Sequence, residues 1–305
     1  MITHCNQTKT KALILLIDFK KAFDSLDQTF MQSCLKMLGF GADIREWIRL
    51  FFTGREAHIL LGGHLTNKIH LDQGVPQGDV VSPYIFILMV ELLLIKINYT
   101  KNIEGIKFAL LEGRSETFAD DTTIYMKRTE HNLRTCVQYI EHFAKVSGLQ
   151  CNIDKTVVCP IGGNFDVNDR LCPELPTLKW EDRFTILGFE IDSKLEHLSN
   201  NYELVHAKVD KMISKWQCYK LTIMGRITIT KSLLLSQYTY VGSVLDMTEF
   251  QTDLIQNKLN AFVLHNKRYI PNETLKQWVK PEVLYGTTSQ GADLQNYADA
   301  ADTSA

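Results

Sequence analysis

Three aspartates are the residues of this sequence best suited to chemistry. Asp120 and Asp121 are adjacent and lie between apolar stretches, and Asp18 directly follows the apolar run Ala12–Ile17. Adjacent carboxylates beside apolar residues are costly unless cations neutralise them. Carboxylates on neighbouring strand ends can hold two divalent ions about 3.5–4 Å apart, which activate an attacking oxygen and steady a leaving oxygen. Magnesium suits such a site because its ligands are hard oxygens.

Each acid also has an explanation that needs no metal. A solvent-exposed acidic turn would account for Asp120 and Asp121, because aspartates are common in turns. Asp18 can instead be an acid that initiates a helix, and Asp24 a cap or first-turn residue of that helix. The three acids by themselves therefore leave both interpretations open.

The acids are expected at the ends of strands. Lys11–Phe19 is a continuous apolar run that predicts a buried central strand with an acid at its end. Glu116–Met126 predicts two short strands around a tight acidic turn, and Phe184–Asp192 predicts a further strand. His58–Leu61 and Lys68–Leu71 predict a hairpin whose loop is longer than the tightest turns.

Helices are expected between these strands. Ser25 with Gln28, and Asp43 with Glu46, have the spacing of capping boxes that open two helices. The apolar stretch Tyr84–Ile97 would reach only about 21 Å as a helix, short of the ~30 Å hydrocarbon core of a bilayer. We therefore expect a buried core helix there, and no membrane partner.

Composition excludes several classes of protein. The chain has 305 residues, of which 45% are hydrophobic and 22% charged, so collagen-like, disulfide-framework and wholly disordered chains are excluded. A formal net charge of −2 excludes a globally basic surface. Seven cysteines without a C-x-x-C pair indicate reduced thiols. The N-terminal residues carry no signal-peptide pattern, so an intracellular protein, cytoplasmic or nuclear and not secreted, is expected.

The composition shifts after about residue 192. Residues 194–231 hold seven Lys or Arg against three acids and have helical patterns, and residues 281–305 contain no Lys or Arg. These changes predict a mixed α/β region over residues 1–193, a helical region over 194–270 and a mobile tail over 271–305.

Several segments taken together resemble the reverse transcriptases of non-LTR (LINE-type) retrotransposons. They occur in the family's order and are Leu16–Ser25, Gly74–Pro83, Phe118–Asp121, Ser147–Thr156 and Ile186–Asp192. Residues 216–226 also look like the family's thumb segment, and the likeness covers residues 10–245. The sequence FADD at Phe118–Asp121 would be weak evidence by itself, whereas several segments in the same order with compatible spacing are specific for the family.

The resemblance implies an α+β fold of the right-hand polymerase type: a palm of antiparallel sheet and packed helices, partial fingers and a helical thumb. It implies an RNA-directed DNA polymerase, which transfers a nucleotide from a dNTP to a primer 3′-OH. By likeness, Asp18 and Asp120 would be the principal ligands of two Mg²⁺ ions, with Asp121 beside them, and Mn²⁺ can take their place. The implied partners are an RNA template, a DNA primer or RNA–DNA hybrid, and dNTPs.

The resemblance also assigns residues to the nucleotide site. Phe23 lies five residues after Asp18, where the family keeps an aromatic steric gate that would clash with a ribose 2′-OH. A core phenylalanine at a helix start is the alternative. Gln77 and Gly78 begin the segment that resembles the template and nucleotide-positioning loop, where glycine permits close backbone approach.

Two further assignments come from the same likeness. Lys155 matches a family lysine that protonates the pyrophosphate leaving group, with a solvated surface lysine as the alternative. Leu187, Gly188 and Phe189 resemble the primer-grip strand, whose backbone would touch the primer end. The basic helices that follow would track duplex phosphates.

The sequence also departs from the family. The upstream fingers segments, the endonuclease and the zinc-binding part of many family members are missing, so we expect a part of a retrotransposon polyprotein truncated at its N-terminal fingers. A catalytically silent remnant that at most binds RNA or RNA–DNA hybrid is the alternative. Phe23 argues against RNA-templated RNA synthesis, and the loop at Gln77 and Gly78 argues against a metal-dependent phosphatase.

Overall fold

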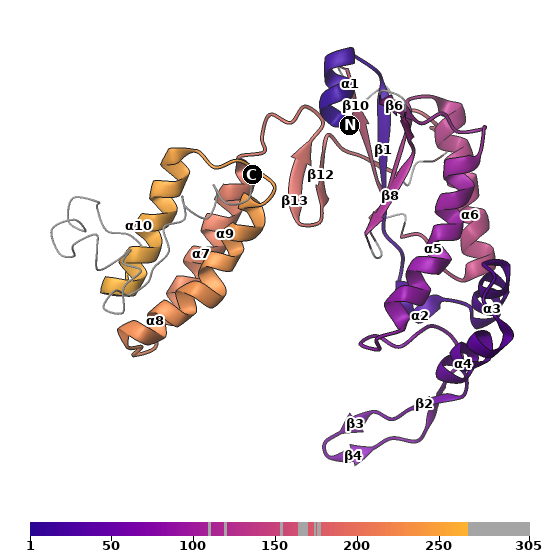
Figure 1. Ribbon diagram of the computed structural model, residues 1–305, viewed down its shortest axis with the longest axis horizontal. Helices are drawn as coiled ribbons and strands as arrows, with labels where there is room; N and C mark the ends of the chain where they lie inside the picture. Colours follow the sequence, from indigo (N-terminus) through magenta and orange to yellow (C-terminus); the bar gives the residue numbers. More distant parts are fainter. Residues whose placement is uncertain are drawn as a thin grey trace. The chain divides into compact units, whose positions relative to one another are not determined.

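A computed structural model describes residues 1–108, 111–118, 121–152, 155–163, 170–173, 175 and 178–267. The chain divides into two compact units, Met1–Glu196 and His197–Ala305 (Figure 1). The predicted boundary after residue 193 lies close to this division. The predicted mobile tail, residues 271–305, lies outside the described residues.

The first unit is built on a five-stranded sheet with strand order β11-β10-β1-β9-β8 (Figure 1). The strands are β1 (Ala12–Ile17), β8 (Ser115–Phe118), β9 (Asp121–Lys127), β10 (Val157–Ile161) and β11 (Lys179–Trp180). The neighbours of β1 and the β8–β9 pair are antiparallel, whereas β10 and β11 are parallel. The sheet is therefore antiparallel at its centre, as predicted, with one parallel pair at its edge.

The apolar run of β1 explains its central place. Five of its six residues are buried, and successive side chains alternate between two cores. Leu13 and Leu15 pack with α5 (Ser82–Tyr99) and α6 (Glu130–Ser147), whereas Ile14 packs with α1 (Ile2–Thr8) and with β6 (Ile106–Phe108). Full burial of such a side chain contributes about 1.5–3 kcal/mol. The prediction of a buried central strand is confirmed.

The helix α5 has 18 residues and extends beyond both ends of the predicted helix Tyr84–Ile97. By length and composition alone it could cross a membrane. Its buried side chains nevertheless belong to the same apolar core as β1, and Phe86 and Met89 have no exposed surface. This burial, rather than insufficient length, identifies α5 as a core helix of the first unit.

The predicted caps of the next helices are wrong. The short helix α2 (Ala22–Ser25) ends where a capping box was expected, and α3 (Gln28–Met37) is capped by Asp27, whose carboxylate accepts from the Phe30 N–H at 2.7 Å. α4 (Ala42–Phe52) begins after Gly41 with no side-chain cap. Several polar residues compete near each start, and packing decides which of them caps the helix.

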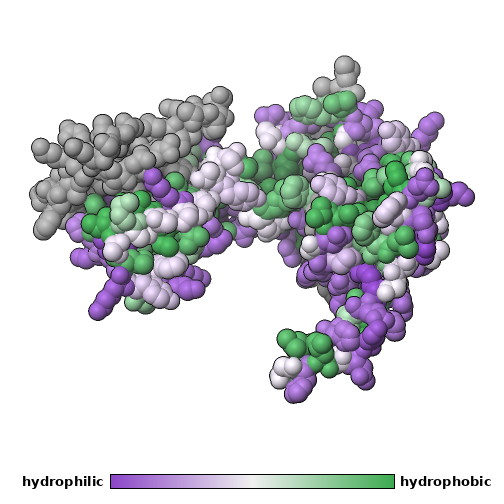
Figure 2. Space-filling view, turned by 60° about the horizontal axis from the view of Figure 1, so that its bottom comes forward, coloured by the Kyte–Doolittle hydropathy of each residue, from purple (hydrophilic) through white to green (hydrophobic). Residues whose placement is uncertain are grey.

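A two-stranded arm leaves the body of the first unit after α4 (Figure 1). Its strands are β2 (Arg55–Ala57), β3 (Leu60–Leu61), β4 (His64–Leu65) and β5 (Ile69–Leu71). Gly62 and Gly63 form its turn with φ of 56° and 84°, so the loop is the two-residue kind and not the longer one predicted. Figure 2 shows apolar surface on this arm, to which Leu60, Leu61 and Leu65 contribute.

The segment predicted as one strand over Phe184–Asp192 is a hairpin. β12 (Arg183–Ile186) pairs with β13 (Phe189–Asp192), and Leu187 and Gly188 turn between them with φ of 49° and 82°. A short apolar run does not reveal a turn in its middle. Glycine adopts such a φ freely, whereas leucine adopts it at a cost. A second small hairpin pairs β6 with β7 (Leu111–Gly113).

The described part of the second unit is helical. It contains α7 (Asn200–Gln217), α8 (Ile223–Ile229), a π-helical turn (Thr230–Leu234), α9 (Leu235–Gly242) and α10 (Glu249–His265). Its core gathers side chains from α7, α9, α10 and the π-helical turn, among them Val209, Tyr238 and Phe262. The helical patterns predicted after residue 192 are confirmed over these ranges.

We predict that Gly148→Ala destabilises the first unit much more than Gly39→Ala. Both glycines follow a helix with positive φ, 77° and 86°, but a Cβ on Gly148 would lie 2.4 Å from the Ser25 carbonyl oxygen and one on Gly39 would meet open space. Gly39→Ala should cost about 1–2 kcal/mol for its backbone conformation. Gly148→Ala should cost about 1–3 kcal/mol more through overpacking. Urea unfolding followed by tryptophan fluorescence measures both, and equal losses would contradict the close contact.

Candidate active site

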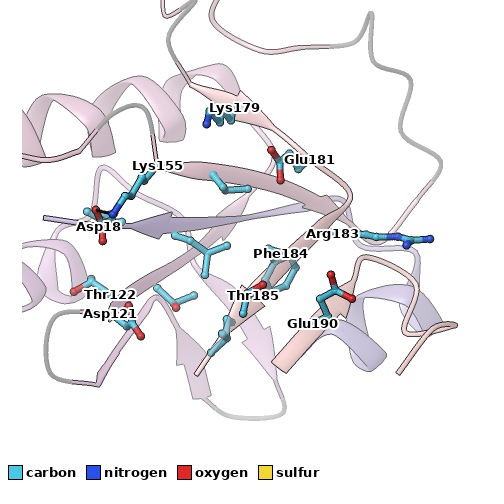
Figure 3. Close-up of a pocket in the computed structure, with 15 residues that line it drawn as sticks. Asp18, Asp121, Thr122, Lys155, Lys179, Glu181, Arg183, Phe184, Thr185 and Glu190 are labelled. Carbon is cyan, nitrogen blue, oxygen red and sulfur yellow. Dashed lines mark ion pairs between the residues drawn. The ribbon is translucent and has the colours of Figure 1, made fainter. Parts of the chain in front are cut away.

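Two of the predicted acids meet at the end of the β1–β9 pair. Asp18 directly follows β1, and Asp121 begins β9. Ile17 is opposite Thr122, so the same antiparallel register continued by one residue puts Asp18 opposite Asp121. Both aspartates line one cleft of about 490 Å³ (Figure 3). The remaining predicted acid, Asp120, lies outside the described residues.

Lys155 lies beside the Asp18 carboxylate. Its Nζ is 3.6 Å from Asp18 Oδ2, and Figure 3 shows the two side chains pointing toward one another. The Lys155 side chain is 69% exposed and that of Asp18 is 36% exposed, so the pair contributes about 0–1 kcal/mol to stability. The pair therefore adds little to the stability of the fold.

Asp18 has a second, closer partner that the sequence analysis did not identify. Asn152 Nδ2 donates to Asp18 Oδ2 at 2.9 Å, and the Asn152 N–H donates to the Asp18 carbonyl oxygen at 2.7 Å. Asn152 stands within the quoted segment Ser147–Thr156, three residues before Lys155. The sequence offered one signal, because the Asn152 amide stands close to the candidate Lys155. Its contact with Asp18, 134 residues away, is visible only in the fold.

The far wall of the cleft comes from the β12–β13 hairpin. Phe184, Thr185 and Glu190 line it together with Arg183, and all four are labelled in Figure 3. The predicted primer-grip residues lie in the same hairpin. Leu187 and Gly188 form its turn and are exposed, whereas the Phe189 side chain is buried.

A second hollow, of about 730 Å³, shares Asp18 and Lys155 with the first and is also lined by Asn152. Lys20 and Lys21 also line it, and both are exposed. Three lysines around one hollow make its local charge positive although the whole chain is slightly acidic. This hollow can attract a polyanion such as a triphosphate.

A third hollow, of about 420 Å³, brings together Phe23, Gln77 and Gly78. The Phe23 ring is half-buried and stacks on Phe86 with centroids 5.0 Å apart. Gln77 Nε2 donates to Asp24 Oδ1 at 3.4 Å. The three residues predicted for the nucleotide site therefore share one hollow, and Lys21 lines both this hollow and the second one.

Backbone contacts fix the loop that carries Gln77. The Val75 N–H donates to the Phe23 carbonyl oxygen at 2.7 Å, and a Cβ on Gly74 would lie 2.5 Å from the Asp24 carbonyl oxygen. Arg55 donates to the carbonyl oxygens of Gln73 and Gly74 at 2.9 and 2.6 Å. Glycine at position 74 is needed because its φ of 73° and this close approach exclude a side chain.

The donor set of the first cleft fits a divalent cation. Asp18 and Asp121 offer hard carboxylate oxygens that solvent can reach, which Mg²⁺ and Mn²⁺ accept. Within the described ranges no group of three or more His, Cys, Asp or Glu residues gathers as a metal cluster. Asp18 and Asp121 are therefore candidate cation ligands in a cleft that Glu181 and Glu190 also line.

The matched protein family is described as reverse transcriptase (RNA-dependent DNA polymerase), over residues 2–191. The chain is 23% identical over 275 residues to the Xenopus laevis transposon TX1 uncharacterized 149 kDa protein, covering 88% of this chain and 21% of that protein. It is 23% identical over 224 residues to the retrovirus-related Pol polyprotein of the Drosophila melanogaster type-2 retrotransposable element R2DM. This match covers 70% of this chain and 20% of that protein. The chain thus spans about a fifth of the length of these relatives.

Solved structures give a weaker likeness. A Candida tropicalis telomerase in complex with a fragment of telomeric RNA matches 86% of this chain and 41% of its own, with 12% identity and a TM-score of 0.46. A Candida albicans telomerase in complex with a fragment of telomeric RNA matches 99% of this chain and 51% of its own, with 11% identity and a TM-score of 0.45.

We predict that Cys151, which forms a bridge with Phe19 next to Asp18, alkylates much more slowly than Cys218. Burial raises the pKa of the Cys151 thiol and outweighs the hydrogen bond with Thr156, which lowers it, so little thiolate is present at neutral pH. Cys136 and Cys159 should not react before unfolding, since burial raises the pKa of each to about 12. Cys218 is exposed. Mass spectrometry after brief iodoacetamide treatment measures the order, and equal labelling of Cys151 and Cys218 would contradict it.

Proposed function

Because the chain belongs to the reverse transcriptase (RNA-dependent DNA polymerase) family, we propose that it carries an RNA-directed DNA polymerase domain of a retrotransposon polyprotein. In the reaction a primer 3′-OH attacks the α-phosphate of a deoxynucleoside triphosphate, the new phosphodiester bond forms and pyrophosphate leaves. The supporting observation is the meeting of Asp18 and Asp121 in one cleft. The proposed partners are an RNA template, a DNA primer and dNTPs.

Asp18 and Asp121 would hold two Mg²⁺ ions, or Mn²⁺ in their place, together with Asp120 as the resemblance implies. Bound ions of this kind activate the attacking hydroxyl and neutralise phosphate charge. The support for this assignment is the chemistry of the two described carboxylates and their place on adjacent strands. The reverse transcriptase family in general depends on divalent metal ions.

Lys155 would serve the leaving group. Its ammonium group lines both the cleft of Asp18 and the positive hollow that contains Lys20 and Lys21. A flexible cation at this junction can donate a proton to the departing pyrophosphate oxygen or stabilise its charge. Lys20 and Lys21 would hold the triphosphate before the reaction.

Phe23, Gln77 and Gly78 would receive the sugar and base of the incoming nucleotide. The stacking of Phe23 on the buried ring of Phe86 supports a steric role, because this packing restricts movement of the ring away from a 2′-OH. Gln77 can donate a hydrogen bond without adding charge. The backbone at Leu187 and Gly188 would touch the primer end.

The exposed lysines of α7 would bind the sugar–phosphate backbone of the duplex. Lys208, Lys211 and Lys215 are exposed and recur at spacings of three and four residues, so they share one face of the helix. Each phosphate that they neutralise should add to the salt dependence of binding.

We predict that Asp121→Asn abolishes primer extension. Loss of one carboxylate removes a cation ligand, and Mg²⁺-dependent incorporation on poly(rA)/oligo(dT) should fall at least ~10²-fold. Asp43→Asn is the control, since Asp43 is an exposed acid on α4 and lines none of the three hollows. Equal incorporation by the wild type and Asp121→Asn would refute the proposal, and a wild type without incorporation would favour the silent remnant.

We predict that Phe23→Val increases the use of ribonucleotides. Removal of the ring opens room for the 2′-OH, so discrimination between dTTP and UTP should fall by about 10–100-fold. Phe30→Val is the matched control, because Phe30 is a half-buried ring that packs on Phe143 and does not line the third hollow. Single-nucleotide incorporation measures both substrates. Unchanged sugar selectivity in Phe23→Val would remove the assignment of a steric gate.

A further inference from the structure

Asn152 is bonded to the main chain and the side chain of Asp18 at once. Its N–H donates to the Asp18 carbonyl oxygen at 2.7 Å, and its Nδ2 donates to Asp18 Oδ2 at 2.9 Å. A carboxylate only accepts hydrogen bonds, so the amide nitrogen must face it and the orientation of the Asn152 amide is fixed by chemistry. The two contacts hold both the position of the Asp18 backbone and the direction of its side chain.

Neighbouring residues extend this attachment. Phe19 forms a bridge with Cys151, and the Lys20 N–H donates to the Gln150 carbonyl oxygen at 2.8 Å. The segment that carries Asn152 therefore runs along the chain just after β1 and holds it over consecutive residues. Asp18 lies at the point where β1 has ended, so this attachment replaces the support that a continuing strand would give.

The Asn152 carbonyl oxygen organises the turn that delivers Lys155. It accepts from the N–H groups of Lys155 and Thr156 at 3.0 and 2.9 Å, and from the Thr156 hydroxyl at 3.0 Å. Lys155 Nζ in turn lies 3.6 Å from Asp18 Oδ2, the oxygen that receives the Asn152 amide. One residue thus links the acid to the lysine.

We propose that Asn152 is a positioning residue that holds Asp18 and Lys155 in a fixed relation for cation binding and leaving-group chemistry. The inference rests on the proposed function and deepens it. A hydrogen bond to Oδ2 fixes the rotation of the carboxylate and therefore the place of its other oxygen. The Asn152 amide donates to this oxygen without adding a charge to the site.

The test measures the binding of Mn²⁺ to the full chain in the absence of nucleotide. Electron paramagnetic resonance monitors the free and bound ion. Asn152→Ala should raise the dissociation constant about 10-fold, in the range seen when a ligand loses its supporting hydrogen bond. Primer extension by Asn152→Ala should require correspondingly more Mg²⁺. Asn6→Ala is the matched control, because Asn6 also joins distant segments, Gly162 and Ser193, but away from Asp18. Its Mn²⁺ affinity should not change.

The outcomes separate the two proposals. If Asp18→Asn leaves Mn²⁺ binding intact, the proposed cation site itself fails. If Asp18→Asn weakens binding and Asn152→Ala does not, the positioning role alone is refuted. If Asn152→Ala lacks a cooperative unfolding transition, Asn152→Ser decides instead, since serine keeps the turn preference but is too short to reach Oδ2.

Discussion

The antiparallel pairing of β1 with β9 is the constraint on which the site depends. With Ile17 opposite Thr122, the acids that follow β1 and begin β9 face each other across two neighbouring strands. A slip of one residue would exchange the side chains of β1 between its two buried cores and disrupt the packing of Leu13 and Leu15 on one side and of Ile14 on the other. The apolar packing of β1 therefore also specifies where two negative charges meet.

Segments distant in sequence complete what the strand pair begins. The turn after Gln150 secures the chain that leaves β1 and brings Lys155 to Asp18, while the loop at Gly74 is fixed against the backbone of residues 23 and 24. The three hollows share lining residues, so acid, lysine and aromatic ring stand in one continuous region of the first unit. Such a region can bind a nucleotide through its phosphates and its sugar together.

The sequence revealed the parts of the fold that depend on strong local patterns. β1 was predicted from its apolar run, and the buried helix α5 was predicted from the apolar stretch Tyr84–Ile97. The cap of α3 was missed because Ser25 and Asp27 both stand near the start, and packing selects the second. The contact of Asn152 with Asp18 was missed because no local pattern reports a hydrogen bond across 134 residues.

Iron-mediated cleavage of the chain tests most directly whether Asp18 and Asp121 share a cation. Fe²⁺ in place of Mg²⁺, with ascorbate and peroxide, generates radicals that cut the backbone near the bound ion. We expect cuts beside both residues, suppressed by excess Mg²⁺ and lost together in Asp18→Asn. Cuts beside only one of them, or cuts beside Asp121 that persist in Asp18→Asn, would contradict a shared site.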